Sequence, residues 1–239
     1  MIDIRGLTVE YEGGIKALDG VDLVISEGDS LGLIGANGAG KSSLFRSLTG
    51  LTAFKGSIMF NGLEVIKKNM PEIRKDIGYV IQESDDQMFM PKVIEDMIFG
   101  PVNYGMAKDD AVKKADEILE QLEISHLKDR YNHKISGGEK KMAAIATILM
   151  MKPKVILFDE PTSSLDPHNR RTVINAIMEI EATKIVASHD LDLIYDICDK
   201  VALLNRGCIV KVGSKDEILR DKKLLEENGL ELPLSFSGR

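Results

Sequence analysis

Residues 35–42 read Gly35-Ala36-Asn37-Gly38-Ala39-Gly40-Lys41-Ser42. They match the pattern G-x-x-x-x-G-K-[S/T] at every fixed position, which is typical of a loop that binds the phosphates of a nucleoside triphosphate. Glycines let the backbone turn tightly and point its N–H groups at phosphate oxygens. Lys41 adds a positive charge for the outer phosphates, and Ser42 adds a hydroxyl that can coordinate Mg²⁺. The alternative is a chance glycine turn before a Ser-capped helix.

The segments on either side of this loop supply the context that the pattern requires. Ser30–Ile34 is a short apolar run, which predicts a buried strand, and a helix is expected from Lys41 to about Thr49. Such a helix directs the positive end of its dipole at a bound anion. We therefore expect residues 35–43, Ser43 included, to bind a nucleotide.

Strands alternate with helices in both directions from the loop, which predicts a mostly parallel sheet with helices on its faces. The further elements expected are strand Leu18–Ile25, a strand and turn over 56–62, strand Ile77–Ile81, strand Val155–Phe158, helix His168–Glu181, strand Lys184–Ala187, helix Leu191–Cys198, strand Val201–Leu204, a hairpin arm over 207–213 and a helical tail over 214–228. The chain shows no internal repeat, so a single unit is expected rather than a fused tandem.

The stretch from about Ser84 to Met151 has a different character, because three helical patterns follow one another. They are Val93–Tyr104, with an interruption expected at Gly100-Pro101, then Lys108–Leu122, then Ser136–Met151. This predicts a helical subdomain inserted into an α/β core. The expected division is 1–83 and 152–213 for the core, 84–151 for the helical subdomain and 214–239 for a C-terminal helical tail.

Two adjacent acids end the strand Val155–Phe158, namely Asp159 and Glu160. Carboxylates at the end of a buried strand are costly unless something compensates their charge, and a divalent cation would do so. Asp159 is the natural partner of Mg²⁺, and Glu160 is expected to polarise a water molecule against the terminal phosphate. The alternative is an exposed loop pair that caps the next helix.

Composition excludes several classes of protein. The 239 residues carry 31 basic and 38 acidic side chains, a net charge of −7, which argues against a basic nucleic-acid binder. Cys198 and Cys208 stand apart from any metal-binding or redox motif, so two free thiols are expected. The N-terminus does not resemble a signal peptide, and the longest apolar run, near 142–151, is too short to span a bilayer. The chain is expected to be soluble by itself.

Residues 135–139, Ile135-Ser136-Gly137-Gly138-Glu139, resemble the LSGGQ signature of the ATP-binding cassette (ABC) family, with Ile for Leu and Glu for Gln. The resemblance covers nearly the whole chain. It implies a P-loop NTPase core that is RecA-like, with an antiparallel β subdomain, and an ATPase that uses ATP and Mg²⁺. It also implies a dimer, expected to be a homodimer, in which Ser136, Gly137, Gly138 and Glu139 close over nucleotide bound by the other subunit. The alternative for this segment is an ordinary Ser-capped helix.

Four further matches fall in the order that the family shows. The resemblance implies that Gln82 contacts Mg²⁺ or water, that His189 contacts the terminal phosphate, and that Tyr11 stacks on adenine. It also implies a loop at the dimer interface, consisting of Ser163, Ser164, Leu165 and Asp166. Taken alone, Gln82 could be a surface residue, His189 an ordinary histidine and Tyr11 a strand residue.

The run Gln82-Glu83-Ser84-Asp85-Asp86-Gln87-Met88-Phe89 resembles the energy-coupling-factor importers, especially their cobalt and nickel ATPase subunits. Met142 departs from that subgroup, in which a basic residue is expected. The apolar residues 88–91 have two interpretations, a groove for a helix of an integral membrane subunit or internal packing. The first places the chain peripherally on the cytoplasmic face of the membrane, with the Gln82–Pro91 region as its partner surface.

Two other functions remain open from the sequence. One is a soluble ABC ATPase that transports nothing, such as a cluster-assembly or repair factor. The other is a nucleotide-binding regulator, against which Asp159, Glu160 and His189 argue. The transported solute is not predictable from residues that never contact it.

Overall fold

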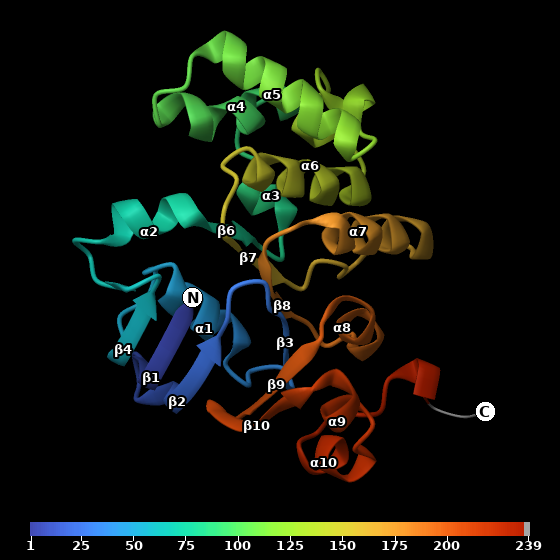
Figure 1. Ribbon diagram of the computed structural model, residues 1–239. Helices are drawn as coiled ribbons and strands as arrows, with labels where there is room; N and C mark the ends of the chain where they lie inside the picture. The colour runs from blue at the N-terminus through green and yellow to red at the C-terminus, as the bar shows by residue number, and fades with distance from the viewer. Residues whose placement is uncertain (237–239) are drawn as a thin grey trace. The chain divides into compact units, whose positions relative to one another are not determined.

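The computed structural model describes residues 1–236, and Figure 1 shows the order of its elements. Residues 237–239, the end of the predicted C-terminal tail, lie outside the described residues. The chain divides into two compact units, one of residues 1–77 with 181–239 and one of residues 78–180, which we treat in turn. None of the helices within residues 1–236 combines the length and the apolar character needed to cross a membrane.

The first unit contains an antiparallel sheet in the order β2-β1-β4-β5. Its strands are β1 (Ile2–Tyr11), β2 (Ile15–Ile25), β4 (Lys55–Phe60) and β5 (Leu63–Glu64). Ile2 pairs with Ile25 on one side and with Phe60 on the other, and all three side chains are buried. This sheet confirms the antiparallel β subdomain, although β1 is absent from the predicted elements.

The same unit holds four strands of a second sheet, in the order β10-β9-β3-β8. They are β3 (Ser30–Ile34), β8 (Thr183–Ala187), β9 (Lys200–Asn205) and β10 (Cys208–Ser214). Strand β3 pairs in parallel with β8 and β9, whereas β10 returns antiparallel to β9. Every residue of β3 and β8 is buried, as expected for parallel strands covered on both faces. The α/β fold with a P-loop core is confirmed.

Among the described residues of the first unit there are also five helices and a short 3₁₀ turn: α1 (Lys41–Leu48), α2 (Met70–Asp76), α8 (Leu191–Ile197), α9 (Lys215–Leu219), α10 (Lys222–Glu227) and η3 (Leu234–Phe236). The predicted single helical tail over 214–228 is two helices. Asp221 separates them, because its carboxylate accepts a hydrogen bond from Leu224 N and so begins α10. Cys198 is buried and Cys208 is exposed, and both are free thiols as predicted.

The second unit contains β6 (Ile77–Val80), which enters it at Gly78, beside β7 (Val155–Asp159). Its helices are α3 (Ser84–Gln87), α4 (Val93–Asn103), α5 (Lys108–Gln121), η1 (Ser125–Leu127), η2 (Asn132–Lys134), α6 (Gly137–Leu149) and α7 (Pro167–Glu179). The apolar side chains of α5 at helical spacing are buried, among them Ala111, Ala115 and Leu119.

The predicted interruption of α4 at Gly100-Pro101 is wrong. Helix α4 continues through Pro101 to Asn103, and Tyr104 N still donates to Gly100 O at 3.1 Å. A proline in the last turn keeps a helical φ and removes only one hydrogen bond, so the helix reaches its end without a break.

Candidate functional site

The phosphate loop connects β3 to α1 in the first unit, and its backbone conformation demands glycine. Gly38 and Gly40 adopt φ angles of 78° and 115°. A Cβ atom at Gly40 would lie 2.4 Å from Ala17 O, and one at Gly35 would lie 2.2 Å from Leu204 O. A larger residue at either position would therefore displace backbone, so two of the motif's fixed positions are structural requirements of this loop.

Lys41 extends across the loop that precedes it. Its ammonium group donates hydrogen bonds to Gly35 O at 2.6 Å and to Ala36 O at 3.4 Å. Gly40 is the N-cap of α1, and no described side chain caps that helix. The first amides of a helix have no partner within it, so this N-terminus offers N–H donors and a positive dipole end to an anion. The loop fits a phosphate, with Lys41 and Ser42 beside those donors.

His189 and Tyr11 lie in the same unit as the loop. His189 follows β8, and Ser188 N donates to Leu33 O at 3.4 Å, so His189 emerges at the end of the sheet where β3 leads into the loop. Tyr11 and Ser43, both predicted to bind nucleotide, share a hydrogen bond of 3.2 Å between their hydroxyls. That bond lowers the pKa of Tyr11 below its usual value.

The two carboxylates lie in the second unit, and both are buried, with Asp159 5% and Glu160 8% exposed. Tyr79 Oη donates to Asp159 Oδ2 at 3.0 Å from the neighbouring strand β6. Glu160 has a φ of 45°, which turns the chain sharply after β7. Helix α7 is capped by Asp166, whose carboxylate accepts from His168 N and Asn169 N. The alternative of an exposed acidic pair capping the next helix is therefore wrong.

The signature-like segment begins α6, and Ser136 is its N-cap. Ser136 Oγ accepts from Glu139 N at 3.3 Å, and Ser136 N donates to Glu139 Oε2 at 2.8 Å, a complete capping box. The bond from the Ser136 backbone is the main reason that the pKa of Glu139 is lowered. The acid that replaces the family's glutamine therefore stays ionised and fixes the start of the helix.

Gly138 packs against α7 in the same unit. A Cβ atom there would lie 2.3 Å from Asn169 Cγ, and the Asn169 amide itself donates to the Asp166 carboxylate. The predicted signature and the predicted interface loop thus meet through Asn169, a residue that belongs to neither sequence motif.

We expect Gly138→Ala to destabilise the protein by about 1–3 kcal/mol, because the added methyl must displace Asn169 from a packed contact. Thermal unfolding of both variants measures it. Gly137→Ala is the matched control, since a Cβ at Gly137 meets no atom within 4 Å and alanine favours a helix. Equal melting temperatures for the two variants would contradict this packing.

The loop that follows Gln82 differs in part from the predicted apolar patch. Met88 is 6% exposed and packs inside, whereas Phe89 is 63% exposed and lies edge-on to Phe99 at 5.0 Å between ring centroids. The interpretation as internal packing therefore holds for Met88, and Phe89 forms an exposed aromatic pair with Phe99. Gln82 is exposed, as a ligand-contacting side chain would be.

Asp96 in α4 fixes the loop that carries Phe89. Its Oδ1 accepts from Phe89 N at 3.2 Å and Met90 N at 3.1 Å, and its Oδ2 accepts from the Asn132 amide. Asn132 also donates to Met90 O at 2.7 Å. Burial raises the pKa of Asp96 above its usual value.

Asp96→Ala should lower the free energy of unfolding by about 2–4 kcal/mol, because two backbone N–H groups lose their acceptor. Asp96→Asn should cost less, since one oxygen remains. The raised pKa means that Asp96 stabilises the fold more at low pH and less as the pH rises through its folded value. The gap in melting temperature between wild type and Asp96→Asn should therefore widen as the pH is lowered through the folded pKa of Asp96, and a gap that narrows would refute this assignment.

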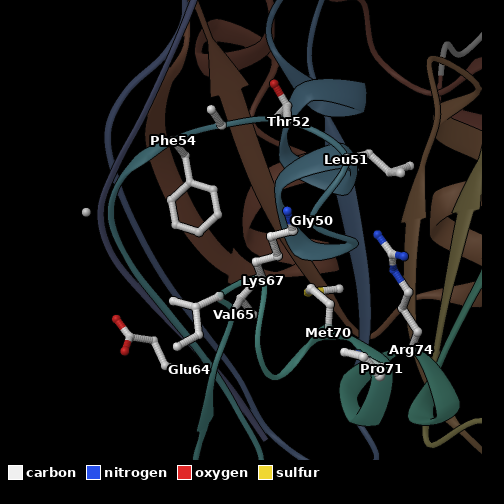
Figure 2. Close-up of a pocket in the computed structure, with 13 residues that line it drawn as sticks. Gly50, Leu51, Thr52, Phe54, Glu64, Val65, Lys67, Met70, Pro71 and Arg74 are labelled. Atoms are coloured by element: carbon white, nitrogen blue, oxygen red, sulfur yellow. The ribbon is translucent and has the colours of Figure 1, made fainter.

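A separate pocket of about 810 Å³ opens in the first unit (Figure 2). The chain after α1 forms one side with Leu51 and Phe54, and Lys67, Met70 and Arg74 line the other. Arg74 donates from Nε to Thr49 O at 3.3 Å, which ties α2 to the end of α1. No predicted nucleotide-binding residue lines this pocket, so it is distinct from the phosphate loop.

A profile of the family described as ABC transporter matches residues 18–163. The energy-coupling factor transporter ATP-binding protein EcfA of Carboxydothermus hydrogenoformans is 40% identical over 98% of this chain and 87% of its own. EcfA of Methanothermobacter thermautotrophicus is 38% identical over 98% of this chain and 77% of its own. Among solved structures, cbiO1 of Clostridium perfringens, part of the ABC transporter complex cbiONQ, matches with a TM-score of 0.84 and 33% identity, covering 95% of this chain and 93% of that one.

Proposed function

This chain belongs to the ABC transporter family, as an ATP-binding subunit with ATPase activity, and we propose that it powers an importer of the energy-coupling-factor type whose cargo is cobalt or nickel ions. The observation that carries the importer type is the likeness to two EcfA proteins over 98% of the chain. The cargo rests on the resemblance of residues 82–89 to cobalt and nickel ATPase subunits.

Each predicted nucleotide contact has a defined role in this proposal. The amides of residues 35–43 and the ammonium group of Lys41 bind the phosphates, and Tyr11 stacks on the adenine. Ser42, Gln82 and Asp159 hold Mg²⁺, which when bound supplies positive charge to the phosphate oxygens. Glu160 orients and polarises the attacking water, and His189 contacts the terminal phosphate.

A second ATPase subunit, expected to be another copy of this chain, completes each site. Residues 136–139 present a helix N-terminus and the Ser136 hydroxyl, both suited to phosphate oxygens of nucleotide on the opposite subunit. Residues 163–166 lie at the interface between the two subunits. ATP favours the closed dimer, and hydrolysis with product release favours separation.

The membrane subunits are expected to bind the Gln82–Pro91 region. Support comes from the exposed Phe89–Phe99 pair, because aromatic side chains are enriched at protein interfaces. Asp96 holds the backbone of this loop, so the aromatic pair sits on a fixed support. The chain is then a peripheral protein on the cytoplasmic face of the membrane.

Affinity purification from detergent-solubilised membranes, followed by mass spectrometry, tests the transporter assignment. We expect integral membrane subunits to co-purify, and Phe89→Ser to release them while ATP hydrolysis by the chain persists. Uptake of radioactive cobalt and nickel by cells expressing wild type or Glu160→Gln tests the cargo. Recovery of the chain with soluble partners alone would favour a cluster-assembly or repair ATPase.

A further inference from the structure

Lys141 is a buried lysine that the nucleotide chemistry above does not use. It lies in α6, five residues after the N-cap Ser136, and is 3% exposed. Its ammonium group donates to Ile81 O at 3.1 Å and to Gln82 O at 2.7 Å. Burial lowers the pKa of Lys141 to about 8. Lysine is seldom fully buried without partners. The hydrogen bonds to these two carbonyl groups therefore account for the burial of Lys141.

The same stretch of backbone is held by a second side chain. Gln87 Oε1 accepts from Ile81 N at 3.1 Å, and Gln87 Nε2 donates to Ala144 O on α6 at 3.0 Å. The polar groups Ile81 N, Ile81 O and Gln82 O are therefore all connected to α6, two by Lys141 and one by way of Gln87. Gln82 itself projects an exposed side chain from this fixed backbone.

We propose that Lys141 is a positioning residue for ATP hydrolysis, because its hydrogen bonds to Ile81 O and Gln82 O make the place of the Gln82 side chain depend on helix α6. This inference rests on the proposed function of Gln82 and adds a link to it. Helix α6 begins with residues 136–139, so a displacement of that segment is transmitted through Lys141 to the Gln82 backbone. The second hydrogen bond from the ammonium group matters, because one hydrogen bond alone would leave this stretch of backbone freer to move.

Lys141→Met keeps the apolar stem and removes the ammonium group. We expect kcat for ATP to fall about 10–100-fold, since misplacement of a catalytic group by about 1 Å costs up to about 100-fold. The KM for ATP should change less than about threefold, because the phosphate loop is untouched. Lys141→Gln, whose shorter amide can reach one carbonyl, should give an intermediate kcat and serves where the methionine variant folds poorly.

Lys114 supplies the matched control. It is a partly buried lysine of α5 in the same unit, with a pKa also lowered by burial, and it donates to Met150 O at 2.6 Å. Lys114→Met should lower the melting temperature much as Lys141→Met does and leave kcat unchanged. An equal loss of kcat in both variants would show a merely structural role for Lys141.

A double-mutant cycle with Gln82→Ala decides whether Lys141 acts through Gln82. Gln82→Ala should itself lower kcat, and adding Lys141→Met should then lower it by less than about twofold more. Fully multiplicative losses would overturn the proposal for Lys141 and leave Gln82 in its role. An unchanged kcat in Gln82→Ala would contradict the roles of both Gln82 and Lys141 in hydrolysis. Absence of ATP hydrolysis in the wild type would contradict the proposed function itself.

Discussion

Glu160→Gln should lower kcat for ATP hydrolysis about 10²–10⁴-fold while Mg-ATP binding survives. Glutamine has the same shape as glutamate, so the buried space after β7 stays filled and the Asp159–Tyr79 hydrogen bond has no reason to change. The amide can accept a hydrogen bond from water, but it cannot take a proton or carry the negative charge that polarises water. Phosphate release under steady-state conditions and binding of a fluorescent ATP analogue separate these two effects.

The same variant should accumulate as an ATP-bound dimer, because hydrolysis is the step that favours separation. Size-exclusion chromatography with and without Mg-ATP measures this. Glu179→Gln, a change of the same chemistry at an exposed site on α7, is the control and should behave as wild type. Normal turnover in Glu160→Gln would contradict the role of Glu160 in hydrolysis. If this variant stayed monomeric at saturating ATP, the predicted ATP-bound dimer would be wrong.

Individual strands and helices were predictable where a short contiguous stretch of sequence carries the signal. The strand Ser30–Ile34 is predicted with its observed bounds, because a continuous apolar run before the glycine loop can only be a buried strand there. Apolar residues also stand at alternate positions in Ile2 and Ile4 and again in Leu7 and Val9, a pattern that predicts a strand, so β1 could have been found from its sequence. Pro71 near the start of α2 is a similar signal, since proline is favoured in the first turn of a helix.

The contacts that hold the candidate site together were not predictable from one sequence. A hydrophobicity pattern assigns a lysine to the surface. Lys141 is nevertheless buried, and its ammonium group donates to Ile81 O, which lies 60 residues away in the sequence. Tyr79 reaches Asp159 across 80 residues, and only the pairing of β6 with β7 brings them together. The contact between Gly138 and Asn169 likewise requires the packing of α6 on α7.

Lys41→Ala should weaken the binding of ATP about 10–150-fold, because hydrogen bonds from a charged group contribute about 1.5–3 kcal/mol. Lys41 also donates to Gly35 O and Ala36 O, so its removal takes away two contacts within the loop as well. Lys41→Met, which keeps the apolar stem, limits that structural effect. Isothermal titration with Mg-ATP measures the affinity, and Lys211→Ala, an exposed lysine of β10, is the control.

A series of ligands separates loss of charge from collapse of the loop. If Lys41 acts on the outer phosphates, its replacement weakens ATP and ADP but leaves the much weaker binding of adenosine nearly unchanged. Equal losses for ATP and adenosine would instead indicate a disordered loop, and unchanged affinity in both variants would contradict the phosphate-loop assignment.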